Sequence, residues 1–181
     1  MHDFSIVLSQ RVQPNGLRSG AAMIFRRKKK SMFEFQDPGQ LVDDDLKLVL
    51  VEKFEGDAAL DLVPSYKFKM TRPAQGQEIG RIDLRIGNLP AIVMYAGHIG
   101  YRVFPDYRGH HYAARSVRLL LPLARRHDLT TIWITCNPDN FASRRTCEIA
   151  GARMIEIVDL PEDNEMYLRG ETQKCRYRLD L

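Results

Sequence analysis

The stretch PDYRGHHYAA at residues 105–114 decides how this chain is expected to fold. It follows the apolar run GYRVF at residues 100–104 and opens a long amphipathic segment, so a strand is expected to turn through Arg108 and Gly109 into a helix. The first N–H groups of a helix have no partner within it and lie at the positive end of its dipole. The corner therefore predicts a socket for a phosphate or pyrophosphate group.

A second strand-to-helix segment lies downstream of this corner. The sequence TIWITC at residues 131–136 is rich in β-branched residues, as strands are, and NPDNFASRRTCEIAGA follows at residues 137–152. The Asn and Asp residues at the start of this second stretch are typical helix N-caps. The chain thus contains two strand-to-helix corners in succession, with a helix and a strand between them.

Together these segments resemble the Gcn5-related N-acetyltransferase (GNAT) superfamily over about residues 42–180. Its members carry Arg/Gln-x-x-Gly-x-Gly/Ala between a strand and a helix, and Arg108 and Ala113 match the two ends of that pattern. His111 stands where the family usually has glycine. Asn140, Ser143 and Gly151 are in register with the family's second motif. The stretch GHIGY at residues 97–101 and the closing pair RY at residues 176–177 are similar to a bacterial branch of predicted acetyltransferases.

The resemblance implies a mixed α/β (α+β) fold, the GNAT-like acyl-CoA N-acyltransferase fold, with a mostly antiparallel central sheet splayed at strands 4 and 5. The hydrophobic pattern predicts the same order, namely strands at 46–51, 66–70, 79–86 and 96–104, a helix after Gly109, a strand at 131–136, a second helix, and strands at 154–158 and 174–179. A short helix is expected at 57–62, and Pro122 predicts a kink or a weakened last turn in the first long helix.

By the same resemblance, acetyl-CoA is the cosubstrate and no metal is required. The residues expected to bind it fall into three groups: the strand backbone of Tyr101, Arg102 and Val103 for the pantetheine arm, the loop of Arg108, Gly109, His110, His111, Tyr112 and Ala113 for the pyrophosphate, and Asn140 with Ser143 on the far side of the arm. The His111 side chain either helps to hold a phosphate or weakens binding. A primary amine, on a small molecule or a protein, would attack the thioester directly.

Two catalytic residues are expected, with alternatives for each. His98 is the candidate base because it lies on the strand before the corner and titrates near neutrality, although a hydrogen-bonded strand histidine is the alternative. The family's usual acid, a tyrosine seven residues after the motif asparagine, is replaced by Cys147. Tyr101 or Tyr112 could supply that proton instead, as could solvent. Loss of the usual acid also leaves a second function open, a CoA-binding regulatory module with little or no turnover.

Charge is distributed unevenly along the 181 residues. Residues 1–31 contain seven Lys and Arg against one Asp, a net +6, so the whole-chain charge of +4 leaves −2 for the remainder. The basic run at residues 26–30 is more typical of a solvated segment than of a binding patch, and a nucleic-acid face is not expected. We therefore expect a loosely packed basic extension at residues 1–40 and one N-acetyltransferase domain at residues 41–181.

Location and assembly are suggested by weaker signals. No apolar run approaches the ~18–20 residues of a membrane span, so no membrane partner is expected. The three cysteines lack metal-ligand spacing and are typical of reduced thiols, which favours a cytoplasmic protein. Strand edges near the C-terminus leave room for a homodimer.

Overall fold

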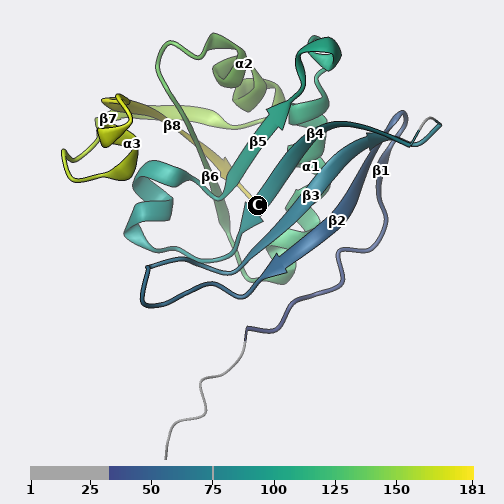
Figure 1. The fold of residues 1–181 in the computed structure, drawn as a ribbon, viewed down its shortest axis with the longest axis horizontal. Coiled ribbons are helices and arrows are strands. Elements are labelled where there is room, and N and C mark those ends of the chain that lie inside the picture. Colours follow the sequence, from purple (N-terminus) through teal and green to yellow (C-terminus); the bar gives the residue numbers. More distant parts are fainter. Residues whose placement is uncertain (1–32, 75) are drawn as a thin grey trace, which may run out of the picture. The chain divides into compact units, whose positions relative to one another are not determined.

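The structure is a computed structural model that describes residues 33–74 and 76–181, so the basic run at residues 26–30 lies outside the described residues. Within these ranges it contains the following elements: β1 (Leu41–Asp43), β2 (Leu46–Phe54), β3 (Ser65–Arg72), β4 (Gln77–Arg85), the π-helical turn η1 (Ile92–Ala96), β5 (Ile99–Val103), the 3-10 turn η2 (Pro105–Tyr107), α1 (Tyr112–Arg126), β6 (Thr131–Cys136), α2 (Phe141–Ala150), β7 (Arg153–Asp159), α3 (Glu165–Leu168) and β8 (Gln173–Asp180). Figure 1 shows how they are arranged.

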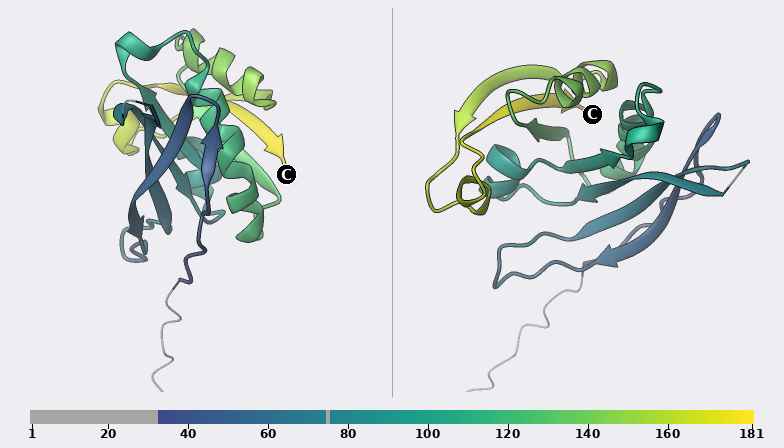
Figure 2. Two further views of the ribbon diagram at one scale, coloured as in Figure 1. Left: turned by 90° about the vertical axis from the view of Figure 1, so that its right-hand side faces the viewer. Right: turned by 45° about the horizontal axis from the view of Figure 1, so that its top comes forward.

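The strands form two sheets. β1 to β5 pair in sequence order as an antiparallel sheet of five strands, and a second antiparallel sheet has the order β6-β8-β7. The fourth and fifth strands of the predicted count are β5 and β6, and they belong to different sheets. The predicted splay in a mostly antiparallel arrangement is therefore confirmed. Figure 2 shows the two sheets diverging from each other.

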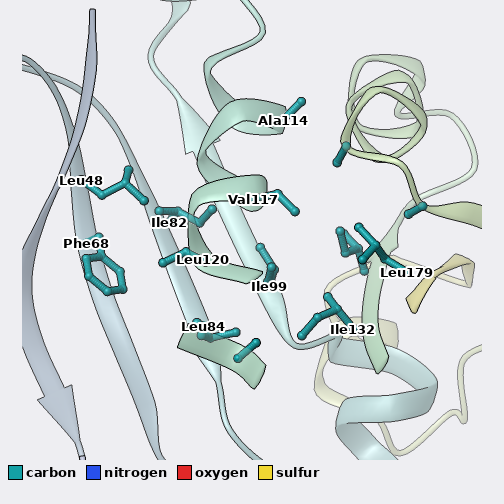
Figure 3. Packing of buried hydrophobic residues seen from close by; sticks show 14 of the residues in the cluster. Leu48, Phe68, Ile82, Leu84, Ile99, Ala114, Val117, Leu120, Ile132 and Leu179 are labelled. Atoms are coloured by element: carbon teal, nitrogen blue, oxygen red, sulfur yellow. The ribbon is translucent and has the colours of Figure 1, made fainter. Parts of the chain in front are cut away.

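Helix α1 packs between the two sheets and joins them through one hydrophobic core. Along the helix, Val117 and Leu120 are completely buried, as the 3.6-residue period of the sequence requires. Their neighbours include Ile82 of β4 on one side and Ile132 of β6 on the other (Figure 3). Burial of each such aliphatic side chain is worth about 1.5–3 kcal/mol, so the apolar face of α1 contributes strongly to the core.

Three local predictions differ from the structure. Residues 57–62 form a tight turn instead of a helix, because Asp57 and Leu62 pair as a β-bridge and Asp61 adopts a φ of 51°. The strand expected from residue 96 begins only at Ile99, since η1 occupies the preceding residues. Helix α1 continues through Pro122 to Arg126, where a weakened last turn was one expectation, whereas the kink expected as its alternative stays a prediction.

The first described residues lie against the domain. The ring of Phe35 is 5.0 Å from that of Tyr66, and the Gln36 N–H donates to the Tyr66 hydroxyl at 2.7 Å. The same hydroxyl lies 2.6 Å from Nε2 of His127, which follows α1. This aromatic cluster closes one end of the core, away from the β5–α1 corner. None of the helices in the described ranges has the length and apolarity needed to cross a membrane.

Candidate functional site

A cleft of about 510 Å3 opens between β5 and α2 and runs to the start of α1. This volume lies in the range of small-molecule sites. Its walls come from β5, the β5–α1 corner and α2: Tyr101, Arg102, Val103, Tyr107, Arg108, Gly109, His111, Tyr112, Ala113, Asn140, Ala142, Ser143, Arg145, Thr146 and Ile149. The structure thus brings together every predicted site residue except His98 and His110. We call this space the first cleft.

The backbone of β5 faces the first cleft at alternate residues. The Arg85 N–H donates to the His98 carbonyl at 2.8 Å, and bonded pairs alternate along an antiparallel ladder. The register therefore turns the N–H and C=O groups of Arg102 toward β4 and those of Tyr101 and Val103 away from it. A ligand lying in the cleft can pair with Tyr101 as an extra strand would. The backbone groups of Arg102 are turned toward β4 within the sheet, whereas its side chain is exposed.

The corner between β5 and α1 has the backbone shape that an anion socket needs. Gly109 adopts a φ of +89°, with nothing within 4 Å of the position that a Cβ would take. His111 is the residue before α1 and adopts a left-handed φ of 57°, a conformation that glycine favours. The N–H groups of the first turn of α1 follow directly, and no side chain caps them. This end of the cleft is therefore rich in donors.

Contacts with the β1–β2 turn hold the corner in place. Tyr112 is buried, and its hydroxyl donates to the carboxylate of Asp45. One turn along α1, the guanidinium of Arg115 donates to Asp43 at 2.7 Å and to Asp45 at 2.8 Å. These hydrogen bonds lower the pKa of Asp45, so its carboxylate stays ionised at neutral pH. The Tyr112 hydroxyl is committed to this contact, although the residue also lines the first cleft.

The basic side chains of the cleft lie at its exposed rim. The Arg108 Nε donates to the Val103 carbonyl at 3.3 Å, which places the guanidinium over the end of β5. Arg145 faces the same space from α2 and pairs with exposed Glu148. His110 is exposed and does not line the cleft, and its ring lies 5.5 Å from that of Tyr112.

The α2 wall contains residues that the sequence reasoning missed. Ala142, Thr146 and Ile149 line the first cleft beside Arg145. Their spacing of three and four residues is that of one helix face. Because Ser143 was already predicted to face the cofactor, the same periodicity could have predicted the others.

The Tyr101 side chain crosses from β5 to α2. Its hydroxyl lies 2.8 Å from the Ser143 Oγ and 3.9 Å from the Sγ of Cys147. Asn140 caps α2 by accepting the Ser143 N–H at 3.0 Å, which fixes the first turn that carries Ser143. Burial raises the pKa of Tyr101, so its phenol is neutral at physiological pH. A hydroxyl from β5 therefore stands beside Cys147, the residue at the family's tyrosine position.

His98 lies at the join of the two sheets, outside both clefts. It is completely buried, its Nδ1 accepts the Trp133 N–H at 3.0 Å, and its Nε2 is 3.2 Å from Asn88 Oδ1. Burial lowers its pKa from 6.5 to about 4, so the ring is neutral near pH 7. With both nitrogens engaged and no exposed surface, the ring has the environment of a hydrogen-bonded structural histidine.

A second, smaller cleft of about 260 Å3 lies on the other side of Tyr101. It shares Tyr101, Asn140 and Ser143 with the first cleft, so the two spaces meet at these side chains. The remaining walls are mostly polar and come from β4, η1, β5, β6 and the end of the chain: Arg85, Ala96, Ile99, Gly100, Thr135, Cys136, Asn137, Glu171 and Lys174.

Charges in the second cleft are paired. Lys174 is nearly buried, and its Nζ donates to Asn137 Oδ1 at 2.6 Å and to the carboxylate of Glu171. The hydrogen bond from Lys174 lowers the pKa of Glu171, so the carboxylate is ionised at neutral pH. Glu171 remains partly exposed at the cleft, and its charge is offset by the ammonium of Lys174.

The three cysteines are buried free thiols. Cys136 lines the second cleft, and a hydrogen bond from Cys147 lowers the pKa of its thiol. In the part of the chain that the structure describes, no three His, Cys, Asp or Glu side chains are grouped to hold a metal ion.

Comparisons with known proteins agree with this architecture. Residues 24–153 match the family profile of the acetyltransferase (GNAT) domain. No curated protein matches the sequence. Among solved structures, the chain is similar to the microcin C7 self-immunity acetyltransferase MccE in complex with acetyl-CoA and AMP, at 16% identity over 65% of this chain and 61% of that one, with a TM-score of 0.51.

Two further solved structures extend the likeness. The ribosomal-protein-S5-alanine acetyltransferase from Vibrio fischeri matches at 18% identity over 64% of this chain and 61% of its own, with a TM-score of 0.51. A Vibrio cholerae protein assigned as a ribosomal-protein-serine acetyltransferase matches at 15% identity over 81% of this chain and 100% of its own, with a TM-score of 0.56. The chain thus spans about three fifths of MccE and of the S5 enzyme. At these identities the likeness concerns the fold.

Proposed function

Because this chain belongs to the GNAT acetyltransferase family, we propose that it transfers an acetyl group from acetyl-CoA to a primary amine by direct attack on the thioester. The observation that carries the proposal is the meeting of two clefts at Tyr101, one bordered by a helix N-terminus and the other polar. Two substrates entering from opposite sides would bring their reacting groups together there. Orientation of the two is then the main contribution of the protein to the rate.

The first cleft suits acetyl-CoA in three respects. The donor-rich start of α1, with Gly109 leaving room above the backbone, would hold the pyrophosphate. The backbone of Tyr101 would pair with the amide groups of the pantetheine arm, since it faces away from β4. Arg108 and Arg145 at the rim would meet the phosphates. The imidazole of His111 lies in the same wall and would touch them as well.

The second cleft suits the acceptor amine. An amine arrives protonated near pH 7, and the ionised carboxylate of Glu171 would attract it. The amine must then lose a proton before it attacks. His98 lies outside the cleft, so we assign this step to solvent reached beside the partly exposed Glu171.

Tyr101 is the proposed proton donor to the departing thiolate. Its hydroxyl is protonated at neutral pH and lies where the two clefts meet. It also lies 3.9 Å from the Sγ of Cys147, the position at which the family usually has its tyrosine on α2. A tyrosine on β5 would thus take over that role. Tyr112 is a weaker candidate because its hydroxyl is bound to Asp45.

The experiment measures cofactor binding and turnover separately. Calorimetric titration with CoA would compare the wild type with Arg108→Ala and with the control Arg125→Ala, an exposed residue in the last turn of α1. Removal of one phosphate-binding arginine is expected to weaken affinity about tenfold, whereas the control stays at the wild-type value. Thiol release from acetyl-CoA would then be followed with a panel of amines. The panel includes peptides with free α-amino groups, because two of the similar structures are ribosomal-protein acetyltransferases.

Three outcomes are informative. Turnover with any amine supports the transferase. Tight CoA binding with no turnover across the panel supports the alternative, a CoA-binding regulatory module, which the absence of the usual tyrosine at Cys147 favours. Absence of CoA binding by the wild type contradicts both.

A further inference from the structure

The join between β5 and β6 is made by a side chain. The His98 N–H donates to the Trp133 carbonyl at 2.7 Å, as in an ordinary sheet. The Trp133 N–H, however, donates to Nδ1 of the His98 ring at 3.0 Å. The imidazole therefore occupies the place of a strand carbonyl at the point where the two sheets meet.

The acceptor role of Nδ1 fixes the tautomer of the ring. A neutral imidazole has one donor and one acceptor nitrogen, so the proton lies on Nε2, which donates to Asn88 Oδ1 at 3.2 Å. Asn88 follows β4, so the ring connects the end of β4 to β6. A charged ring would carry a proton on Nδ1 and could not accept the Trp133 N–H.

The backbone around the join is closely packed. Gly97 has a φ of +73°, and a Cβ there would lie 3.0 Å from the Trp133 carbonyl and 3.1 Å from the Thr135 nitrogen. The Thr135 hydroxyl donates to the Tyr95 carbonyl at 2.7 Å. Beyond these contacts the strands separate, and the second cleft begins at Gly100 and Thr135.

We propose that His98 is a positioning residue, whose neutral ring fixes the point where β5 and β6 separate and thereby sets the width of the clefts at Tyr101. Without the ring nitrogen, the partly buried Trp133 N–H loses its acceptor, and β6 must shift to find another. Tyr101 lies three residues further along the chain, in β5, so the shift reaches both clefts. The effect on acetyl-CoA rests on the proposed function, whereas the join itself requires no ligand.

Two substitutions at one site separate positioning from catalysis. In His98→Asn, the amide oxygen can take the place of Nδ1 and accept the Trp133 N–H. In His98→Leu, a side chain of comparable bulk offers no acceptor. The matched control is His127→Leu, which removes the Nε2 contact with the Tyr66 hydroxyl at the far end of the core.

Each variant would be characterised by its melting temperature, its Kd for CoA, and its KM and kcat. His98→Leu is expected to raise Kd and KM for acetyl-CoA by about tenfold or more, and His98→Asn to stay within about threefold of the wild type. His127→Leu should lower the melting temperature and leave Kd unchanged. A catalytic base would give the opposite result, because kcat would fall in both His98 variants while Kd stayed constant.

A folded His98→Leu protein with the wild-type Kd would overturn the proposal, as would an Asn variant no better than Leu. Should His98→Leu not fold, nitrogen NMR of the wild-type ring without ligand provides the test. Nδ1 must be the bare nitrogen and Nε2 the protonated one, and the opposite tautomer would refute the assignment. The backbone amide chemical shifts of Tyr101 in ligand-free His98→Asn provide a readout that does not depend on acetyl-CoA. A large difference from the wild-type shifts would contradict rescue by Asn.

Discussion

The buried His98 ring predicts a loss of stability in mild acid. Its pKa is about 4 in the folded protein, against an ordinary value of 6.5. The folded protein therefore binds fewer protons than the unfolded chain between these two pH values. Stability falls as the pH decreases through this window, and no further loss from this group occurs below about pH 4. Each pH unit of the window is worth about 1.4 kcal/mol, so the total loss is about 3 kcal/mol.

Urea denaturation of the wild type and of His98→Asn at several values between pH 4 and pH 7.5 would measure this contribution. The other groups with lowered pKa values, among them Asp45, Glu78 and Glu171, are common to both proteins and cancel in the difference. The free energy of unfolding of the wild type relative to His98→Asn should thus decrease by about 3 kcal/mol from pH 7 to pH 4.

A His127→Asn variant provides the control. The pKa of His127 is also lowered by burial, but that ring is only partly buried, so its own pH dependence should be weaker. If the free energy of unfolding depended on pH in the same way for the wild type and His98→Asn, the reasoning would be refuted. The His98 ring would then titrate alike in the folded and the unfolded protein.

Three further predictions concern the clefts and the join. Tyr101→Phe should lower kcat roughly tenfold to a hundredfold in steady-state assays, with little change in the Kd for CoA, whereas Tyr66→Phe should leave kcat unchanged. Arg145→Ala should weaken CoA binding severalfold and reduce its dependence on salt, as measured by titration at two ionic strengths. Gly97→Ala should destabilise the fold by about 1–3 kcal/mol in urea denaturation, because its φ is +73° and the new Cβ would press on the backbone of β6; an unchanged midpoint would contradict the close packing of the join.

The parts of the site that the sequence predicted are encoded over a few neighbouring residues. The corner at Arg108 and Gly109 is one example, since Gly109 adopts the positive φ that its position in the motif suggests. The start of α2 is another, because Asn140 accepts the Ser143 N–H three residues along. Such features depend on turn and cap chemistry that a short stretch of sequence carries by itself.

The parts that the sequence could not predict depend on contacts between distant residues. The splay itself was expected only from family resemblance, and the contact beside which the two strands separate joins His98 to Trp133, 35 residues away. Similarly, nothing local indicates that the Tyr101 hydroxyl reaches Cys147, 46 residues away. The wrong prediction of a helix at residues 57–62 has a different, local reason, because pairing of Asp57 with Leu62 outweighs a weak helical preference.

One departure from the family pattern, Cys147, lies opposite a hydroxyl group that β5 supplies. Cys147 removes the hydroxyl that α2 would supply, and Tyr101 provides one from the facing strand. That replacement works only if β5 stands at a fixed distance from α2. In our proposal, the start of β5 is held by the hydrogen bond from the Trp133 N–H to the His98 ring. His98 and Tyr101, expected from sequence as base and acid, are therefore connected in a different way: the first holds the strand from which the second reaches the proposed reaction centre.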